Sequence, residues 1–306
     1  MSLLTEKTIR PTLGGHEKFV FRQGWLKKGF DAALQDESIF LAENAFVTLG
    51  VGKNMAHAIR HWCLATGLLE DFAGKGLAKL VKPSTLGLHL MGPKGWDPYL
   101  EDIGSLWLIH WLLATNHNRG LAWYLVFSRY MDVEFRKLQL LNFLSKQMPQ
   151  SGVNTTEGMI QRELDVFLHT YVPVQNKKGA FAEESLDCPL VDLNLLRFVA
   201  EDDIYRFNIG PKISLPAEVF GYSLMMYLRQ IATNRRTVAV DECVYQPGSP
   251  GQTFKLDENS VIVYLERLEE ITSGGLRLQE TAGLRQIYLH DLNDDSAFKL
   301  LREYYA

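Results

Sequence analysis

The most apolar stretch of the chain constrains its fold most, and it reads IGSLWLIHWLLA over residues 103–114. A helix needs about 20 apolar residues to cross a bilayer, so this stretch is too short to span a membrane. A helix that is apolar on every face is instead buried inside a protein. We therefore expect residues 103–114 to form a central core helix and His110 to be a structural histidine.

Breaks in the helical pattern divide the 306 residues into three expected domains, 1–100, 101–236 and 237–306. This division agrees with the usual domain size of about 100–200 residues. Apolar side chains recur mostly at helical spacing, which predicts a mainly α fold of the α+β class. The middle domain should be mostly helical, and one of its helices should begin at Thr155 or Thr156, which are candidate N-caps.

The first domain has the element order of a winged helix-turn-helix module. Residues 22–35 and 53–69 carry apolar side chains at helical spacing, and Gly67 is a natural helix stop. The basic segment that follows, from residue 75, reads as short β-segments around a Pro83–Ser84 turn. Two helices followed by a basic hairpin predict a winged-helix-like DNA-binding domain.

A glycine-rich stretch at residues 49–62, LGVGKNMAHAIRHW, lies at the start of the second helix. It is not a P-loop, because Gly52-Lys53 is followed by Asn54 rather than by serine or threonine. It is not a dinucleotide fingerprint either, because Met55 stands where the third glycine is needed. No nucleotide cofactor is therefore indicated, and what remains is a helix N-terminus whose free N–H groups suit a phosphate.

The basic and polar residues of the first domain are candidate DNA contacts. Residues 1–100 carry 12 Lys and Arg against 9 Asp and Glu, whereas the whole chain has a net charge of −4. The alternative is an ordinary solvated polar surface. The predicted DNA-binding residues lie on both helices and on the hairpin, and they are Arg22, Lys27, Lys28, Lys53, Asn54, His57, Arg60, His61, Lys82, Ser84 and Thr85.

Acidic residues of the middle domain raise the question of metal-dependent DNA cleavage. Such chemistry needs two or three carboxylates that converge on Mg²⁺ or Mn²⁺. The segment AEESLDCPLVD supplies four candidate catalytic carboxylates, Glu183, Glu184, Asp187 and Asp192. The alternative is a solvated acidic loop, and no established nuclease spacing accompanies them. The segment TNHNRG at 115–120 resembles a histidine-containing nuclease loop, but its surroundings lack the strand and helix pattern of that motif.

The last domain repeats the order of the first on a smaller scale. A turn at residues 245–256 precedes a helix at 257–272, and the segment LRLQETAGLRQIYLHDL then alternates like a strand pair. We expect a small winged-helix-like unit of mixed α and β structure. Three widely separated cysteines and an N-terminus without a signal pattern favour a reduced, cytoplasmic location with no membrane contact.

Five blocks of sequence resemble an uncharacterised bacterial family encoded in DNA phosphorothioation and phage-defence clusters. They are FRQGWLKKGFDA, LGVGKNMAHAIRHWC, DPYLEDIGSLWLIHWLL, SLDCPLVDL and SPGQTFKLDE followed by TAGLRQIY. The family resembles in function the DNA-nicking subunit of Ssp-type systems. The resemblance implies a role in preparing or holding DNA for sulfur insertion. It also implies a cysteine desulfurase, an ATP pyrophosphatase-like sulfurtransferase and an ATPase as partners.

Three functions remain open at this point. The chain is a DNA-binding component that nicks DNA with the help of a metal, a non-catalytic adaptor that recruits sulfurtransferase and ATPase partners, or a transcriptional regulator. A regulator of this type needs a dimer that reads two half-sites, and the sequence shows no dimerisation coiled coil.

Overall fold

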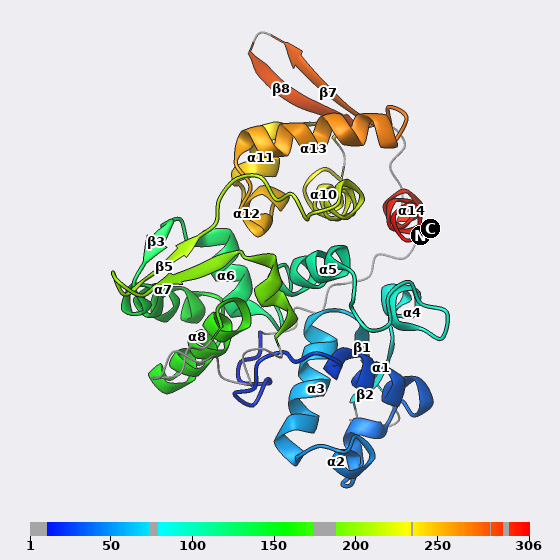
Figure 1. Ribbon diagram of the computed structural model, residues 1–306, viewed down its shortest axis with the longest axis vertical. Coiled ribbons are helices and arrows are strands. Elements are labelled where there is room, and N and C mark those ends of the chain that lie inside the picture. The colour runs from blue at the N-terminus through cyan, green and yellow to red at the C-terminus, as the bar shows by residue number, and fades with distance from the viewer. Residues whose placement is uncertain (1–10, 74–78, 174–187, 234, 282, 290–293) are drawn as a thin grey trace.

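The described part of the protein is mainly helical and has three small antiparallel sheets, as a computed structural model shows (Figure 1). The structure describes residues 11–73, 79–173, 188–233, 235–281, 283–289 and 294–306. The predicted mixed α+β class is thus confirmed at this level. The winged-helix character of the first and last units and the boundaries of the three domains stay predictions.

The described part of the first unit begins with three α-helices and a short 3-10 helix, and it continues with a hairpin and a further α-helix. Its elements are α1 (Trp25–Gln35), η1 (Ile39–Leu41), α2 (Ala45–Thr48), α3 (Lys53–Ala65), β1 (Leu69–Ala73), β2 (Lys79–Pro83) and α4 (Thr85–Met91). The hairpin pairs Leu69 with Pro83 and Ala73 with Lys79. The predicted turn at Pro83–Ser84 is therefore wrong, because Ser84 is instead the N-cap of α4 and accepts a hydrogen bond from the Gly87 amide.

The middle unit packs its helices around the expected core helix. Its elements are α5 (Ile103–Ala114), α6 (Leu121–Arg129), β3 (Glu134–Phe135), α7 (Lys137–Gln150), α8 (Glu157–Tyr171), η2 (Pro189–Leu193), β4 (Leu196–Val199), β5 (Ile204–Phe207) and α10 (Ala217–Ile231). All residues of α5 except Ile103 and Leu112 are buried, which confirms the core helix. Thr156 is the N-cap of α8, as predicted.

His110 at the centre of α5 is a structural residue. Its Nε2 donates to the carbonyl oxygen of Thr253 at 2.9 Å, so its Nδ1 accepts from the Tyr171 hydroxyl at 2.8 Å. Burial lowers the pKa of His110 to about 4, and the ring is therefore neutral near pH 7.

The last unit places a helix and a long hairpin beside α10. Its elements are β6 (Thr237–Ala239), α11 (Val240–Tyr245), α12 (Pro250–Phe254), α13 (Glu258–Ile271), β7 (Leu276–Thr281), β8 (Leu284–Leu289) and α14 (Asp294–Tyr304). The predicted helix after Asp257 and the alternating strand pair are confirmed. The expected turn before Asp257 also contains the short helix α12, whose N-cap Ser249 accepts from the Gln252 amide.

The C-terminal helix ties the last unit to the core. In Figure 1, α14 lies beside α10 and between the upper and lower parts of the molecule. The Tyr304 hydroxyl donates to Asp102 at 2.6 Å, and the Tyr305 hydroxyl is 2.7 Å from the Ser105 hydroxyl. Asp102 and Ser105 lie at the start of α5, so these two hydrogen bonds hold the C-terminal residues against the core helix.

Two buried lysines sit where α6, α12 and α13 meet. Lys212 Nζ donates to the carbonyl oxygens of Asn208, Gly210 and Lys255 at 2.8, 2.8 and 3.1 Å. Three acceptors use all three N–H bonds of an ammonium group, so the geometry favours a charged Lys212. Desolvation nevertheless lowers the pKa of Lys212 to about 8.

Lys255 is the more deeply buried of the two. Its Nζ donates to the Phe127 carbonyl oxygen at 2.8 Å, in the last turn of α6, where carbonyl groups lack helical partners. The ammonium also lies over the Phe207 ring at 4.4 Å. Burial lowers the pKa of Lys255 from 10.5 to about 7, because the apolar surroundings disfavour the charged ammonium.

The three cysteines of the chain are core residues. Cys63, Cys188 and Cys243 are free thiols, and all three are buried. Among the described residues, no helix combines the length and the apolar character that a membrane crossing requires.

Candidate nucleic-acid interface

The glycine-rich stretch before α3 forms an open helix N-terminus. Gly50 has a φ of 62°, in the left-handed region, and Gly52 is the extended N-cap residue without a capping side chain. Lys53 and Asn54 are exposed in the first helical turn. The first amide groups of α3 are therefore not satisfied by a side-chain cap, and two polar side chains stand next to them.

Three basic residues of α3 line one groove. Lys53, His57 and Arg60 are spaced by four and three residues, which puts them on the same side of the helix. The groove has a volume of about 450 Å³ and lies between α3 and the η1–α2 segment. Helices α2 and α3 lie in the lower part of Figure 1. Its lining residues are Phe40, Leu41, Ala42, Glu43, Ala45, Phe46, Lys53, Ala56, His57 and Arg60.

The charge of this groove is positive near neutral pH. Lys53 and Arg60 face a single carboxylate, Glu43, among the lining residues. Arg60 is half-buried, and in the described part of the chain it forms no hydrogen bond or ion pair. Its pKa is lowered, first by desolvation and then by the nearby Arg119 guanidinium, while Asp71 acts in the opposite direction.

Arg119 comes from the turn between α5 and α6, which is fastened to the end of α3. The Asn116 amide donates to the carbonyl oxygens of Leu64 and Ala65 at 3.4 and 2.9 Å. Its side-chain oxygen accepts from the Asn118 and Arg119 amides, both at 3.1 Å. This turn is the TNHNRG segment, so part of its polar character serves to cap a helix C-terminus rather than to form a nuclease loop.

The Arg119 side chain forms an ion pair with the hairpin. Arg119 Nη2 is 2.6 Å from Asp71 Oδ2 on β1, and both side chains are about four-fifths buried, with exposed fractions of 19% and 23%. Sequence reasoning missed Arg119 because no local pattern indicates that it pairs with a hairpin residue 48 positions earlier in the chain. This ion pair depends on the docking of the α5–α6 turn onto α3.

His61, which the sequence placed among the DNA contacts, lies in the core. It is 5% exposed, and its ring lies against His16 with the ring centroids 5.8 Å apart. Desolvation, together with the neighbouring His16, Arg119 and Arg60, keeps the pKa of His61 well below its usual value. The C-terminal half of α3 is covered on all sides, so its polar residues do not reach solvent as those of its first turns do.

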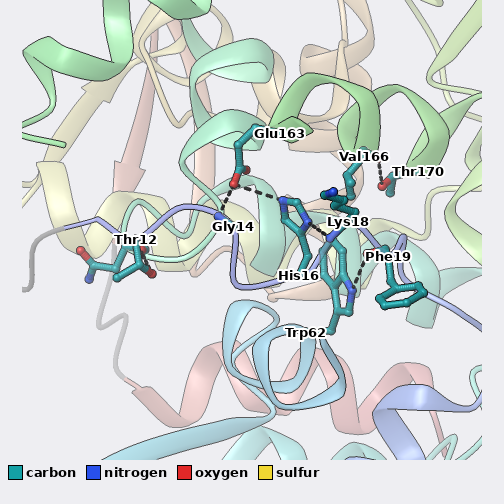
Figure 2. Close-up of polar contacts among 10 residues, drawn as sticks. Thr12, Gly14, His16, Lys18, Phe19, Trp62, Glu163, Val166 and Thr170 are labelled. Atoms are coloured by element: carbon teal, nitrogen blue, oxygen red, sulfur yellow. Dashed lines mark hydrogen bonds and ion pairs between the residues drawn. The ribbon is translucent and has the colours of Figure 1, made fainter. Parts of the chain in front are cut away.

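The cover over this half of α3 is the N-terminal segment, which is held by a buried carboxylate (Figure 2). Glu163 Oε1 on α8 accepts from the Gly14 amide at 2.5 Å and lies 3.1 Å from His16 Nε2. His16 Nδ1 accepts a hydrogen bond from the Lys18 amide at 3.2 Å. This network fixes residues 14–18 across the helix and excludes solvent from His61.

The predicted basic residues of the first helix serve local packing in this structure. The Arg22 guanidinium lies over the Trp25 ring at 5.3 Å. Lys27 pairs with Asp31 at 2.6 Å, and the exposed Lys28 donates to the Leu49 carbonyl oxygen at 2.9 Å. Each of these basic groups therefore has a partner within the protein.

The predicted hairpin residues lie in three different settings. Lys82 on β2 is exposed and pairs with Glu70 across the hairpin at 3.3 Å. Ser84 caps α4, and its hydroxyl also donates to the Gly67 carbonyl oxygen at 2.7 Å, which leaves it a structural residue. Thr85 is exposed in the first turn of α4.

The arrangement of the four candidate metal ligands stays a prediction, because three of them lie outside the described residues. Glu183, Glu184 and Asp187 lie outside the described residues, and Asp192 is exposed on η2. In the ranges that the structure describes, no group of three or more His, Cys, Asp or Glu side chains could hold a metal ion.

Comparison with known proteins gives one family and two similar crystal structures. The family described as "Protein of unknown function (DUF4007)" matches residues 13–305. The structure titled "SspB crystal structure" is 30% identical, has a TM-score of 0.87 and covers 96% of this chain and 88% of its own. "Magnesium ion-bound SspB crystal structure" is 29% identical with a TM-score of 0.86 and the same coverage. No curated protein matches the chain.

Proposed function

The chain belongs to the DUF4007 family, and from this premise we propose that it is a DNA-binding component of a bacterial DNA phosphorothioation and defence system. The similarity to SspB over nearly the whole chain supports this assignment, together with the five sequence blocks described above. The main support for DNA binding is the row of Lys53, His57 and Arg60 along the groove of α3. In this proposal the chain works in the cytoplasm with a cysteine desulfurase, a sulfurtransferase and an ATPase.

The shape of the first unit supports a helix docked on DNA. Lys53 and Arg60 are seven residues apart, which is about 10 Å along a helix. Cations at this spacing can contact successive phosphates, and the exposed Asn54 at the helix N-terminus can reach base edges, as recognition helices do in winged-helix proteins. The hairpin with its exposed Lys82 would then act as the wing.

A salt titration of DNA binding tests this proposal. The double variant Lys53→Ala with Arg60→Ala removes two cations, so the slope of log K against log salt should fall by roughly 2 for duplex DNA. The measurement is fluorescence anisotropy with a labelled duplex from about 50 to about 200 mM salt. Lys299→Ala, an exposed lysine of α14, is the matched control. A double variant with the affinity and slope of the unchanged chain would refute DNA docking through α3.

Metal-dependent nicking of DNA is a second candidate function, favoured by the similarity to a magnesium-bound SspB structure. The assay is the conversion of supercoiled plasmid into open circles with Mg²⁺, Mn²⁺ or EDTA. Nicking that needs metal and is lost in the double variant Asp187→Ala with Asp192→Ala would support these carboxylates as ligands. Nicking that survives the double variant would assign the metal to other residues, and DNA binding without nicking would leave the adaptor role.

A further inference from the structure

On the premise of the proposed function, we propose that the exposed face of α13 and two adjoining pockets bind a segment of a partner protein. The segment would place an apolar side chain in one pocket and a lysine or arginine at the other. The partner is then the desulfurase, the sulfurtransferase or the ATPase of the phosphorothioation system. Since α13 lies in the upper part of Figure 1 and α3 in the lower part, protein and DNA would bind to different parts of the fold.

The two helices that directly precede a hairpin differ in charge. Helix α3 precedes β1 and carries Lys53 and Arg60 without any carboxylate. Helix α13 precedes β7 and carries four glutamates against one arginine, Arg267. Such a helix repels the phosphates of DNA and attracts a basic protein segment. In the predicted winged-helix-like unit, α13 has the position of a recognition helix, but its charge favours a protein over DNA.

A groove with a volume of about 580 Å³ lies along the exposed side of α13. Asn259, Val263 and Arg267 are spaced by four residues, so they share one face of the helix, and all three line the groove. Ile213 on the preceding loop lines it as well. Val263 is 63% exposed and Ile213 is fully exposed. Large apolar side chains that gather in one groove, rather than being scattered, indicate an interaction site.

The loop that forms the second wall of this groove is fixed before any partner arrives. The Tyr264 hydroxyl on α13 donates to the carbonyl oxygens of Lys212 and Leu215 at 2.9 and 3.0 Å. Lys212 Nζ donates to three further carbonyl oxygens, as described above. Residues 208–215 are therefore held against α12 and α13, and a partner does not have to order them, which lowers the entropy cost of binding.

A second pocket, with a volume of about 240 Å³, adjoins the groove. Asp257 lines both, and the segment 209–213 separates them, because Ile209 lines the pocket and Ile213 the groove. Met131 and Tyr245 also line the pocket, and they are 66% and 52% exposed. The groove and the pocket thus form one continuous surface with exposed apolar side chains on both sides of the segment.

The charge of the pocket favours a basic side chain as its occupant. Asp132 is exposed at the pocket, and hydrogen bonds from Ser260 are the main cause that lowers the pKa of Asp257. Lys255 also lines the pocket, but it is buried and its Nζ points to the Phe127 carbonyl oxygen. In a two-fold dimer through this face the same carboxylates would face one another, which disfavours a second copy of the chain as the occupant.

Isothermal titration calorimetry of the full chain with each of the three proposed partners, purified separately, tests this surface. One partner should bind, and Ile213→Asp with Val263→Asp should weaken its binding at least roughly 10-fold. Asp132→Lys should weaken binding roughly 3- to 10-fold at low salt and reduce its dependence on salt. The matched control is Leu138→Asp with Leu284→Asp, at residues that are 65% and 68% exposed on α7 and β8.

Thermal unfolding is recorded for every variant, and Asp132→Lys lies outside α13, so it remains informative if the substitution in α13 lowers the melting temperature. A partner that binds both variants as tightly as the unchanged chain overturns the docking surface and leaves the proposed function intact. If the unchanged chain binds duplex DNA but none of the three partners, the docking surface and the partners fail while DNA binding stands. Duplex binding or self-association that is lost in the Ile213→Asp and Val263→Asp variant assigns the face to DNA or to a second copy, and either result overturns the proposal.

Discussion

The buried amine of Lys255 should reduce the stability of this protein near neutral pH, and its removal should be stabilising. Its pKa is about 7 in the folded state, against an ordinary value of 10.5. Between these two values the unfolded chain binds more protons than the native state, so the free energy of unfolding rises with pH. At about 1.4 kcal/mol per pKa unit, the full shift corresponds to roughly 5 kcal/mol at pH values below 7.

The variant Lys255→Met keeps the length of the side chain and removes the charge. It also leaves the Phe127 carbonyl oxygen without its partner, which costs about 1–3 kcal/mol. At about pH 7 the perturbed amine still lowers the free energy of unfolding by roughly 4 kcal/mol. Removing it should therefore make the variant more stable there by roughly 1–3 kcal/mol, after the cost of the lost hydrogen bond. This advantage should shrink by roughly 2 kcal/mol at about pH 9, where the native amine is already neutral.

Urea unfolding followed by tryptophan fluorescence measures both quantities. The difference between the variant and the unchanged chain isolates Lys255, because Lys212 and the buried cysteines titrate equally in both proteins. Lys299→Met, at an exposed lysine, should show no comparable dependence on pH. A stability difference for Lys255→Met that is the same at both pH values would refute a perturbed amine at this position.

Three further predictions concern the core and a helix cap. Because the pKa of His110 is about 4 in the fold and 6.5 without it, stability should fall as the pH drops from 6.5 towards 4. His110→Gln should flatten this part of the pH profile of urea unfolding. Ser84→Ala should lower the free energy of unfolding by about 1 kcal/mol through loss of the α4 cap. Gly87→Ala should cost more than Ser84→Ala in the same urea measurement, because a Cβ there would collide with the Leu68 carbonyl oxygen.

Local sequence signals were sufficient for several elements of this fold. The apolar run of α5 predicted a core helix because no face of it could be left in water. Thr156 predicted the start of α8 because its side chain can satisfy a free amide of the first turn. The alternation of apolar and polar side chains on either side of Gly283 predicted the β7–β8 hairpin, since successive residues of a strand face opposite sides of the sheet. In each case the controlling interaction lies within a few residues of the element.

The segment of α4 shows where such signals mislead. Leu86, Leu88 and Leu90 alternate with other residues and so imitate a strand. In the structure Leu86 and Leu90 are buried one helical turn apart, and Leu88 is 46% exposed. A helix of seven residues is too short to be stable alone, so its form depends on the packing partner that the rest of the chain supplies.

The sequence by itself determined that Lys53, His57 and Arg60 share one face of α3, because helical spacing is a local property. It could not determine that His61 is buried, because the N-terminal segment that covers it is anchored by Glu163, which lies 149 residues after Gly14 along the chain. Nor could it pair Arg119 with Asp71 of the hairpin, because that contact depends on the docking of the α5–α6 turn onto α3. Helical periodicity assigns residues to faces, and only tertiary packing decides which faces meet solvent, core or another charge.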